Sequence, residues 1–302
     1  MTSTVEYLTA KRVVDDRALN RRVWDRFVAE LADGVCEADE PIRIVDVGAG
    51  VGSMIARLAA WDGLPAHVSY RGVDLDEDAV AAGRDRLPGW LEAAGYDVSG
   101  RSDAICARRD AGGRESAEQR LDVTLEVGDA FSITDDADAV IAAAFVDLVA
   151  LEPALARFRE LLCENGILYA PLTFDGATGF APAHSLDDRI ERLYHRHMDE
   201  IRDQPGSSRA GRKLLAACPD AGYDVLEVGG SDWLVGAGDA GDRERTVARY
   251  LLETIDGALA DYPDDVLGPA TRARWLETRT EQLENDELVV VAHHLDVLAR
   301  TR

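Results

Sequence analysis

Lysine and long apolar runs are almost missing from this chain of 302 residues. Arginine supplies all but two of its 33 basic side chains, the exceptions being Lys11 and Lys213. No run of about 18 apolar residues occurs, so we expect no membrane-spanning helix. The first seven residues lack the basic and apolar regions of a secretory signal peptide. We therefore expect a cytoplasmic protein with no membrane association.

Cysteine is also scarce, and its spacing is uninformative. The four cysteines, Cys36, Cys106, Cys163 and Cys218, are widely separated. Zinc sites and disulfide frameworks are recognised by closely paired cysteines, so we expect neither, and no bound metal. We expect the cysteines to be small buried side chains in a reducing compartment.

Basic residues are few in comparison with acidic ones. The chain has 57 acidic against 33 basic side chains, a formal net charge of −24, and the acids are spread along the sequence. Such a surface repels phosphate backbones, so we expect no nucleic-acid partner, although nucleic-acid enzymes of halophiles are acidic too. Two origins of the acidity stay open: adaptation to a salt-loaded cytoplasm, where ions screen self-repulsion, or the composition of a high-GC coding sequence.

The most informative residues that are present form a strand, a turn and a helix. Four β-branched apolar residues within 42–47 predict a strand, and three glycines follow at alternate positions, Gly48, Gly50 and Gly52. Glycine tolerates positive φ and has no Cβ, so the backbone can turn sharply and a ligand can lie against it. The segment 54–60 predicts a helix that begins at this turn. Together these elements indicate a nucleotide-binding unit.

The spacing of the glycines separates two kinds of nucleotide site. A dinucleotide site needs a third glycine where this chain has Ser53. Present instead is an acid inside the strand end, Asp46, two residues before Gly48. This arrangement resembles motif I of the class I methyltransferases that use S-adenosylmethionine (SAM). A glycine turn without a ligand is the alternative.

The resemblance implies that SAM is the cofactor and that the strand end and turn surround it. SAM has an ammonium group and two ribose hydroxyls that need acceptors, and it has no phosphate. The residues implied to contact it here are Asp46, Gly48, Ala49, Gly50 and Gly52.

A second predicted strand, 68–74, supports this interpretation. It ends at Asp74, 22 residues after Gly52, where a carboxylate can accept both hydroxyls of an adenosine ribose. Leu75 follows directly and is assigned to the same site. Asp76 is the alternative acid, although an acidic N-terminus of the next helix explains it equally simply.

A third predicted strand, 121–127, runs into Gly128 and Asp129. In the family that the chain resembles, an acid at this place receives the adenine amino group and its neighbours cover the ring. Asp129 and Ala130 are therefore implied to bind the cofactor. The Gly-Asp dipeptide is also an ordinary turn, so its agreement with the first two motifs carries the inference.

The expected methyl acceptor lies beyond the next strand, 137–145. In an open parallel sheet, ligands bind outside the carboxyl ends of the strands, so Phe145 and Asp147 border the place of transfer. We assign Phe145 to the cofactor and Asp147 to orienting or deprotonating the acceptor. A helix-capping role for Asp147 is the alternative.

Two further catalytic candidates lie on a segment rich in glycine and proline, 173–185, which we expect to be a loop. It carries aromatic and titratable side chains suited to a small organic ligand. Asp175 is a candidate base, and His184 is another because an unperturbed imidazole titrates near neutral pH. A surface or core histidine is the alternative for His184.

The order of predicted elements indicates an α/β fold. The resemblance implies a Rossmann-like, doubly wound sheet of seven strands, mostly parallel, with an antiparallel last strand at 287–293. We expect a helical N-terminal segment, 1–40, with one amphipathic helix over 16–33, followed by a methyltransferase domain, 41–302. Arg12 and Arg17 on that segment are candidates for the carboxylate of SAM. We also expect a polar surface insertion at 95–120 and helical lids over the acceptor at 173–220 and 240–285.

The sequence therefore predicts a SAM-dependent methyltransferase that acts on oxygen or nitrogen of a small molecule. Alternatives are a SAM-binding protein without turnover, a methyltransferase for RNA or protein, and an NAD-dependent oxidoreductase. Neither the acceptor nor the oligomeric state follows from the sequence.

Overall fold

The computed structural model describes residues 2–33, 40–100, 104–110, 118–203, 205–236 and 241–302, and every structural statement below concerns these residues. The strands are β1 (Ile42–Val47), β2 (His67–Asp74), β3 (Asp97–Ser99), β4 (Ala104–Arg109), β5 (Gln119–Val127), β6 (Ala137–Ile141), β7 (Leu162–Ala181), β8 (Tyr223–Gly230), β9 (Trp233–Val235) and β10 (Val289–Thr301). The helices are α1 (Thr4–Ala18), α2 (Arg21–Ala32), α3 (Ser53–Ala60), α4 (Glu77–Ala93), α5 (Leu151–Leu161), α6 (Asp187–Arg196), α7 (Ala210–Ala217), α8 (Asp242–Ala260) and α9 (Pro269–Glu284). Short helical turns are η1 (Ala130–Ser132), η2 (Val146–Leu148) and η3 (His197–Ile201).

The strands form one sheet in the order β3-β4-β5-β2-β1-β6-β7-β10-β8, and β9 pairs with β10 beside this path. β5, β2, β1, β6 and β7 are parallel, whereas β10 is antiparallel to both of its neighbours, β7 and β8. The chain builds outward from β1 in one direction through β2 and β5, and in the other through β6 and β7. This confirms the predicted doubly wound fold with an antiparallel last strand, and it places a topological switch point at β1.

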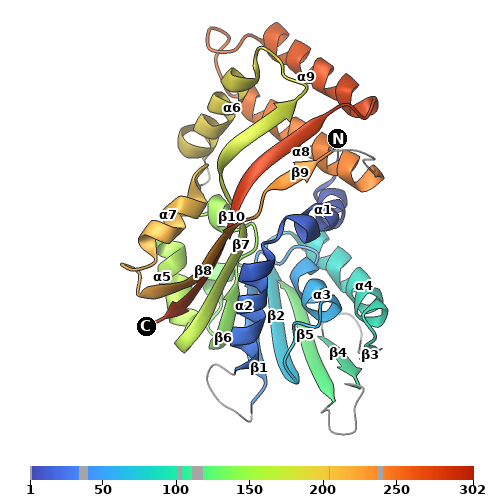
Figure 1. The fold of residues 1–302 in the computed structure, drawn as a ribbon, viewed down its shortest axis with the longest axis vertical. Helices are drawn as coiled ribbons and strands as arrows, with labels where there is room; N and C mark the ends of the chain where they lie inside the picture. Colours follow the sequence, from blue (N-terminus) through green and yellow to red (C-terminus); the bar gives the residue numbers. More distant parts are fainter. Residues whose placement is uncertain (1, 34–39, 101–103, 111–117, 204, 237–240) are drawn as a thin grey trace.

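Helices cover both faces of the sheet because the strands are apolar on both faces. Along β1, Ile44 belongs to a core with α2, α3 and α4, whereas Val45 and Val47 belong to a core with α5 and α7. Successive side chains of a strand point to opposite faces, which accounts for this division. A third core joins α1, α6, α8 and α9 to β9 and to the outer ends of β7 and β10, above the sheet in Figure 1.

The helix expected over 16–33 is confirmed over Arg21–Ala32, but its start is wrong. The chain forms α1 and α2, separated at Leu19 and Asn20. The Asn20 side chain accepts a hydrogen bond from the Val23 backbone N–H, as an N-cap does, and its own N–H donates to Asp296. The amphipathic pattern of 16–33 therefore spans the end of one helix and the start of another.

The expected loop at 173–185 is wrong over most of its length. β7 continues to Ala181, paired with β10 as far as Val289. The glycines that suggested a loop are accommodated inside this strand, where Gly176 has a φ of 88°. Pairing with a long partner strand outweighs the weak strand propensity of glycine.

Two other sequence expectations need correction. The insertion at 95–120 is partly ordered sheet, because β4 pairs antiparallel with β5 and β3 pairs antiparallel with β4. The last strand runs from Val289 to Thr301 and does not end at 293. Strand pairing at a distance, which the local pattern does not encode, decides both cases.

The cysteine expectation is wrong at one position. Cys106 and Cys218 are free, whereas Cys163 is disulfide-bonded. Cys36 lies outside the described residues. Spacing along the sequence does not reveal which cysteines the fold brings together, so the argument for a reducing compartment loses its support. In the described part of the chain, no helix combines the length and apolarity needed to cross a bilayer.

Two glycines of α4 give a matched test of how closely this helix packs against the nucleotide turn. A Cβ on Gly83 would lie 3.0 Å from the backbone carbon and oxygen of Val51, whereas a Cβ on Gly89 would meet no atom within 4 Å. We expect Gly89→Ala to stabilise the protein by about 1 kcal/mol, from helix propensity. We expect Gly83→Ala to destabilise it by about 1–3 kcal/mol, from overpacking.

Denaturant unfolding of the two variants measures both effects in the same helix. Because helix propensity favours alanine equally at the two positions, the difference between them isolates the contacts at Gly83, with Val51 and with Cδ1 of Leu125 at 3.0 Å. Equal stabilisation by both substitutions would contradict close packing of α4 on the turn.

Candidate active site

The glycine turn after β1 has the backbone conformation that its sequence requires. Gly48, Gly50 and Gly52 have φ values of 69°, 53° and 75°, in the region that side chains with a Cβ rarely adopt. A Cβ on Gly48 would lie 2.5 Å from Cδ2 of Phe145, and one on Gly50 would lie 3.3 Å from Cδ1 of Leu8. Phe145, the residue before η2, thus contacts the turn at Gly48, and Leu8 of α1 contacts it at Gly50.

Asp74 is fixed beside this turn at the carboxyl end of β2. Its Oδ2 accepts a hydrogen bond of 2.7 Å from the Gly50 backbone N–H, and its Oδ1 accepts one of 2.9 Å from the Asp76 N–H. Asp76 instead caps α4, because its side chain accepts from the Ala79 N–H. The next residue, Leu75, is 75% exposed. Of the two acids, Asp74 is therefore the one aimed at the turn.

The end of β5 lies next to Asp74. The Gly128 N–H donates to the Asp74 backbone oxygen at 2.9 Å. Asp129 is exposed, caps η1, and accepts a 2.9 Å hydrogen bond from the Phe131 N–H. The Phe131 ring lies 6.4 Å from the Phe145 ring, centroid to centroid. The structure thus brings the ends of β1, β2, β5 and β6 together, as the motif spacing predicts.

Asp46 lies beneath the turn and not on its surface. The side chain is buried and accepts a hydrogen bond from the Tyr70 hydroxyl. Burial raises the pKa of Asp46 to about 7, although the Tyr70 hydrogen bond lowers it in part. Its Oδ1 has no hydrogen-bond partner within the described residues. These contacts suit a group that supports the turn from below.

Asp147 lies in η2, at the carboxyl end of β6. Its Oδ1 is buried and has no hydrogen-bond partner in the part of the chain that the structure describes. Burial raises the pKa of Asp147, an effect reduced by the Phe174 backbone and by the charges of Arg202 and Lys11. Its backbone oxygen accepts hydrogen bonds from the Ser207 N–H, at 3.1 Å, and from Arg202. The backbone is held while one carboxylate oxygen stays unpaired.

Tyrosines from three helices gather near Asp147. Tyr7 of α1 stacks on Tyr250 of α8, with ring centroids 3.9 Å apart. Burial raises the pKa of Tyr194, on α6, to about 12, and the charge of Asp147 adds to that rise. Lys11 forms a 3.0 Å ion pair with Asp15 and lies over the Trp233 ring. The Asp147 carboxylate and the three tyrosine rings therefore lie where the sheet meets the upper helices.

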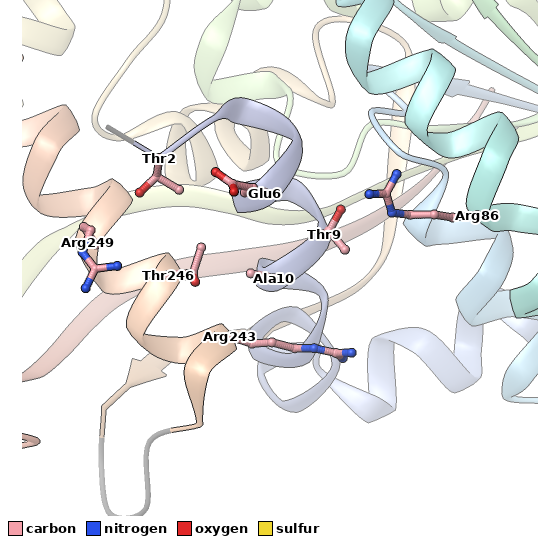
Figure 2. Close-up of a pocket in the computed structure, with 8 residues that line it drawn as sticks. All are labelled: Thr2, Glu6, Thr9, Ala10, Arg86, Arg243, Thr246 and Arg249. Atoms are coloured by element: carbon pink, nitrogen blue, oxygen red, sulfur yellow. The ribbon is translucent and has the colours of Figure 1, made fainter.

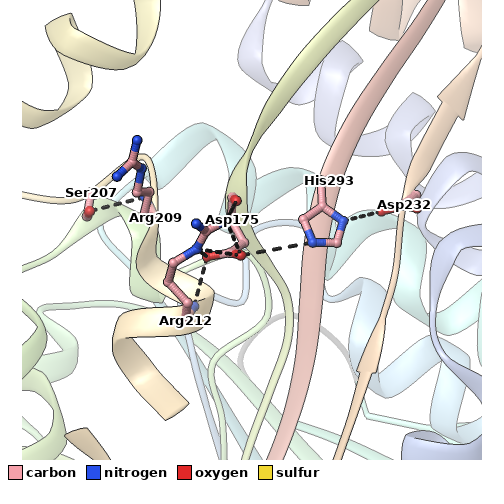
Figure 3. A network of polar contacts seen from close by, with 6 residues as sticks. All are labelled: Asp175, Ser207, Arg209, Arg212, Asp232 and His293. Atoms are coloured by element: carbon pink, nitrogen blue, oxygen red, sulfur yellow. Dashed lines mark hydrogen bonds and ion pairs between the residues drawn. The ribbon is translucent and has the colours of Figure 1, made fainter. Parts of the chain in front are cut away.

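Asp175 is engaged in a separate polar network (Figure 3). Both carboxylate oxygens lie 3.0 Å from Nε of Arg212, and Oδ1 also accepts from the Arg212 backbone N–H. Nε2 of His293 lies 3.9 Å away, and Nδ1 of His293 lies 2.6 Å from Asp232. These contacts tie β7 to α7 and to β10. The Asp175 carboxylate is thus held by Arg212 in a network separate from the glycine turn.

His184 and the two candidate arginines also have structural partners. Nδ1 of His184 accepts a hydrogen bond from the Leu186 N–H, just beyond the outer end of β7. Arg17 pairs with Glu244 at 2.7 Å. Arg12 lies 3.9 Å from Asp16 and over the Trp90 ring. Each of these three side chains therefore has a partner within the protein.

His294, which the sequence analysis did not single out, lies in the same aromatic region. Its ring is 5.5 Å from Phe174 and 5.1 Å from Trp233. Burial lowers the pKa of His294 to about 3, with Lys11 adding to the effect. Nothing in the local sequence distinguishes it from the exposed His293, because strand alternation alone decides which of the two faces inward.

We expect His294 to make the protein sensitive to acid. The unfolded chain binds a proton at this group below pH about 6.5 and the folded chain only below about 3, so stability falls as the pH drops between these values. Relative to His294→Asn, the wild type should lose about 1.4 kcal/mol per pH unit in this window. Asp46 acts in the opposite sense below pH 7, so the comparison must be with the variant. Urea unfolding at pH 6 and pH 4.5 measures the difference; parallel losses in both proteins would contradict it.

In the described residues, no cluster of three or more His, Cys, Asp or Glu side chains is placed to hold a metal ion. The residues that do converge are the turn glycines, Asp74, Asp129, Phe145 and Asp147. Leu8, Tyr7 and Tyr250 complete the surroundings, from helices whose tertiary positions the sequence does not show. The convergent groups can bind hydroxyls and a planar ring, and can accept a proton beside them.

Comparisons with known proteins agree on the fold only. No family model matches the chain, and a search of curated proteins finds no similar sequence. Over its full length the chain is similar to a SAM-dependent methyltransferase from Thiobacillus denitrificans solved with S-adenosyl-L-homocysteine, with 16% identity, a TM-score of 0.47 and 100% of both chains covered. The corresponding protein from Geobacter sulfurreducens, also solved with S-adenosyl-L-homocysteine, matches at 15% identity and a TM-score of 0.46, covering 95% and 93% of the two chains.

A geranyl diphosphate C-methyltransferase from Streptomyces coelicolor matches at 14% identity and a TM-score of 0.42, covering 93% of this chain and 80% of that one. These structural neighbours are SAM-dependent methyltransferases. At such identities and TM-scores, the matches assign no function to this chain.

Proposed function

We propose that this protein is a SAM-dependent methyltransferase that acts on oxygen or nitrogen of a small molecule. The observation that carries the proposal is the position of Asp74, whose carboxylate is hydrogen-bonded to Gly50 of the positive-φ turn. A carboxylate there is suited to paired ribose hydroxyls. When bound, SAM supplies an activated methyl group.

The residues present fit SAM better than a dinucleotide. In a dinucleotide site, free N–H groups at the helix N-terminus bind a pyrophosphate. Here the Gly50 N–H already donates to a carboxylate, and the neighbouring acids Asp76, Glu77 and Asp78 add negative charge. A pyrophosphate would meet repulsion at this place, whereas a group without phosphate would not.

The roles of individual residues follow from their positions. Asp74 would hold the ribose. Leu75, which is exposed, and Phe131 would flank the adenine ring, and Asp129 would accept a hydrogen bond from the adenine amino group. Asp46 supports the turn from below. The unpaired oxygen of Asp147 is available to take the proton that an O–H or ammonium acceptor loses.

The helices above the sheet are proposed to enclose the acceptor. α6, α8 and α9 lie over the outer ends of β7 and β10, and Tyr7, Tyr194 and Tyr250 line their junction with α1. An enclosed, aromatic and negatively charged surround favours a small organic acceptor over RNA. This is the basis for placing the acceptor lids at 173–220 and 240–285.

Two measurements test the proposal. Calorimetry with SAM and with NAD should show binding of SAM alone. A transfer assay with tritiated methyl groups, run on metabolite, RNA and protein fractions, should label the metabolite fraction. SAM binding without transfer to any fraction would indicate a protein without turnover, and binding of NAD would overturn the cofactor assignment.

A further inference from the structure

A cavity lies outside the site described above, at the junction of α1, α4 and α8 (Figure 2). It has a volume of about 330 Å³, at the lower end of the range of about 300–1,000 Å³ for small-molecule pockets. The side chains that line it are Thr2, Glu6, Thr9, Ala10, Arg86, Arg243, Thr246 and Arg249. Arg86 thus comes from α4, Thr9 from α1, and Arg243, Thr246 and Arg249 from α8.

The arginines of this cavity differ from their neighbours in having no carboxylate partner. Within the described residues, Arg243 and Arg249 make no hydrogen bond or ion pair, and Arg86 donates only to the Ala82 backbone oxygen of its own helix. By contrast, Arg245 of the same helix pairs with Asp242 and Asp286. In a chain of net charge −24, three arginines without acidic partners therefore line one space.

A buried hydroxyl points to the same conclusion. Thr9 is one of the lining residues, and its Oγ1 is buried with no hydrogen-bond partner in the described part of the chain. The one acid in the lining, Glu6, is occupied by Ser3, whose N–H and hydroxyl both donate to its Oε2. The lining therefore offers three guanidinium groups and an unsatisfied hydroxyl against one engaged carboxylate.

The cavity is separated from the donor site by the body of α1. Leu8 contacts the glycine turn, whereas Glu6, Thr9 and Ala10 face the cavity. At about 100° per residue, these three side chains point between about 100° and 160° away from Leu8 around the helix. A ligand in the cavity would therefore be distinct from SAM.

We propose that this cavity binds a small molecule through a phosphate or diphosphate group. Guanidinium groups bind phosphate oxygens in pairs, and a hydroxyl can donate to a third oxygen. Guanidinium groups from α4 and α8, with a threonine of α1 between them, surround the space from several sides. The inference does not depend on the proposed methyltransferase activity.

Titration calorimetry with sodium pyrophosphate tests the proposal without SAM. We expect the wild type to bind at one site and the double variant Arg243→Ala/Arg249→Ala to bind at least about tenfold more weakly, because two charge-assisted contacts are lost. The matched control is Arg192→Ala/Arg274→Ala, which removes the same charge from exposed arginines of α6 and α9. It should bind as the wild type does.

The controls decide between a site and general charge attraction. An equal loss in both double variants, or no loss in either, would overturn the proposal, as would tighter binding of citrate than of pyrophosphate. Thermal unfolding adds an independent reading, because pyrophosphate should raise the Tm of the wild type and of the control but not of the Arg243/Arg249 variant. Circular dichroism checks that the variants are folded.

Discussion

Asp74→Ala is expected to weaken SAM binding by about ten- to a hundredfold. A hydrogen bond to a charged group contributes about 1.5–3 kcal/mol, and about 1.4 kcal/mol corresponds to a factor of ten in Kd. The carboxylate is only part-buried, so water compensates for some of the loss, and the Gly50 N–H loses its partner as well. Calorimetry at one fixed salt concentration measures the change.

The matched control for this substitution is Asp78→Ala. Asp78 is an exposed acid in the first turn of α4, so its removal changes the net charge equally without touching the glycine turn. SAM affinity should stay within about twofold of the wild type, since a surface charge is screened by salt. Unchanged affinity in Asp74→Ala would remove the basis of the SAM assignment.

Asp147→Asn is expected to lower kcat by about 10²–10⁴-fold while leaving SAM affinity unchanged, the range typical of losing a general base. Asparagine has nearly the same shape, so the change removes the charge and the proton acceptor but keeps the packing of η2. The unpaired carboxylate oxygen becomes part of a neutral amide, which cannot serve as a base. The assay is methyl transfer to the acceptor found in the fractionation experiment.

The pH profile separates catalysis from structure at this residue. Burial raises the pKa of Asp147, so the wild-type rate should fall on acidification with a midpoint above the ordinary pKa of an aspartate. That limb should be missing in Asp147→Asn. Glu152→Gln, an exposed acid in the first turn of α5, serves as the control. A kcat within threefold of the wild type in Asp147→Asn would contradict the assigned role.

The sequence was a good guide to the backbone of the glycine turn and to the position of Asp74, because local signals determine both. Glycines that require positive φ, and acids directly after strands, determine the turn and the position of Asp74 without reference to the rest of the chain. The parallel strands then bring Asp129 and Phe145 to the same edge, since the carboxyl ends of neighbouring strands coincide.

The region proposed to bind the acceptor was less predictable, because its residues come from distant segments of the chain. The Tyr7–Tyr250 stack joins α1 to α8, and no local pattern encodes it. Asp175 was a candidate by residue type, and its pairing with Arg212 of α7 could not be seen in the sequence. Gly176 suggested a loop, but the ladder between β7 and β10 kept the chain extended. The halophilic origin of the acidity stays a prediction.

The length of β7 has a consequence for how ligands could enter and leave. This strand continues from the sheet into the upper helical part and stays paired with β10 over most of its 20 residues. A movement of the upper helices that separated β7 from β10 would break the hydrogen bonds between these strands. Each buried backbone group left unpaired would then cost free energy. α1 is joined to α2 only through Leu19 and Asn20, and it covers the turn through Leu8. Exchange of ligands is therefore expected to involve displacement of α1, with the rest of the enclosure acting as a rigid frame.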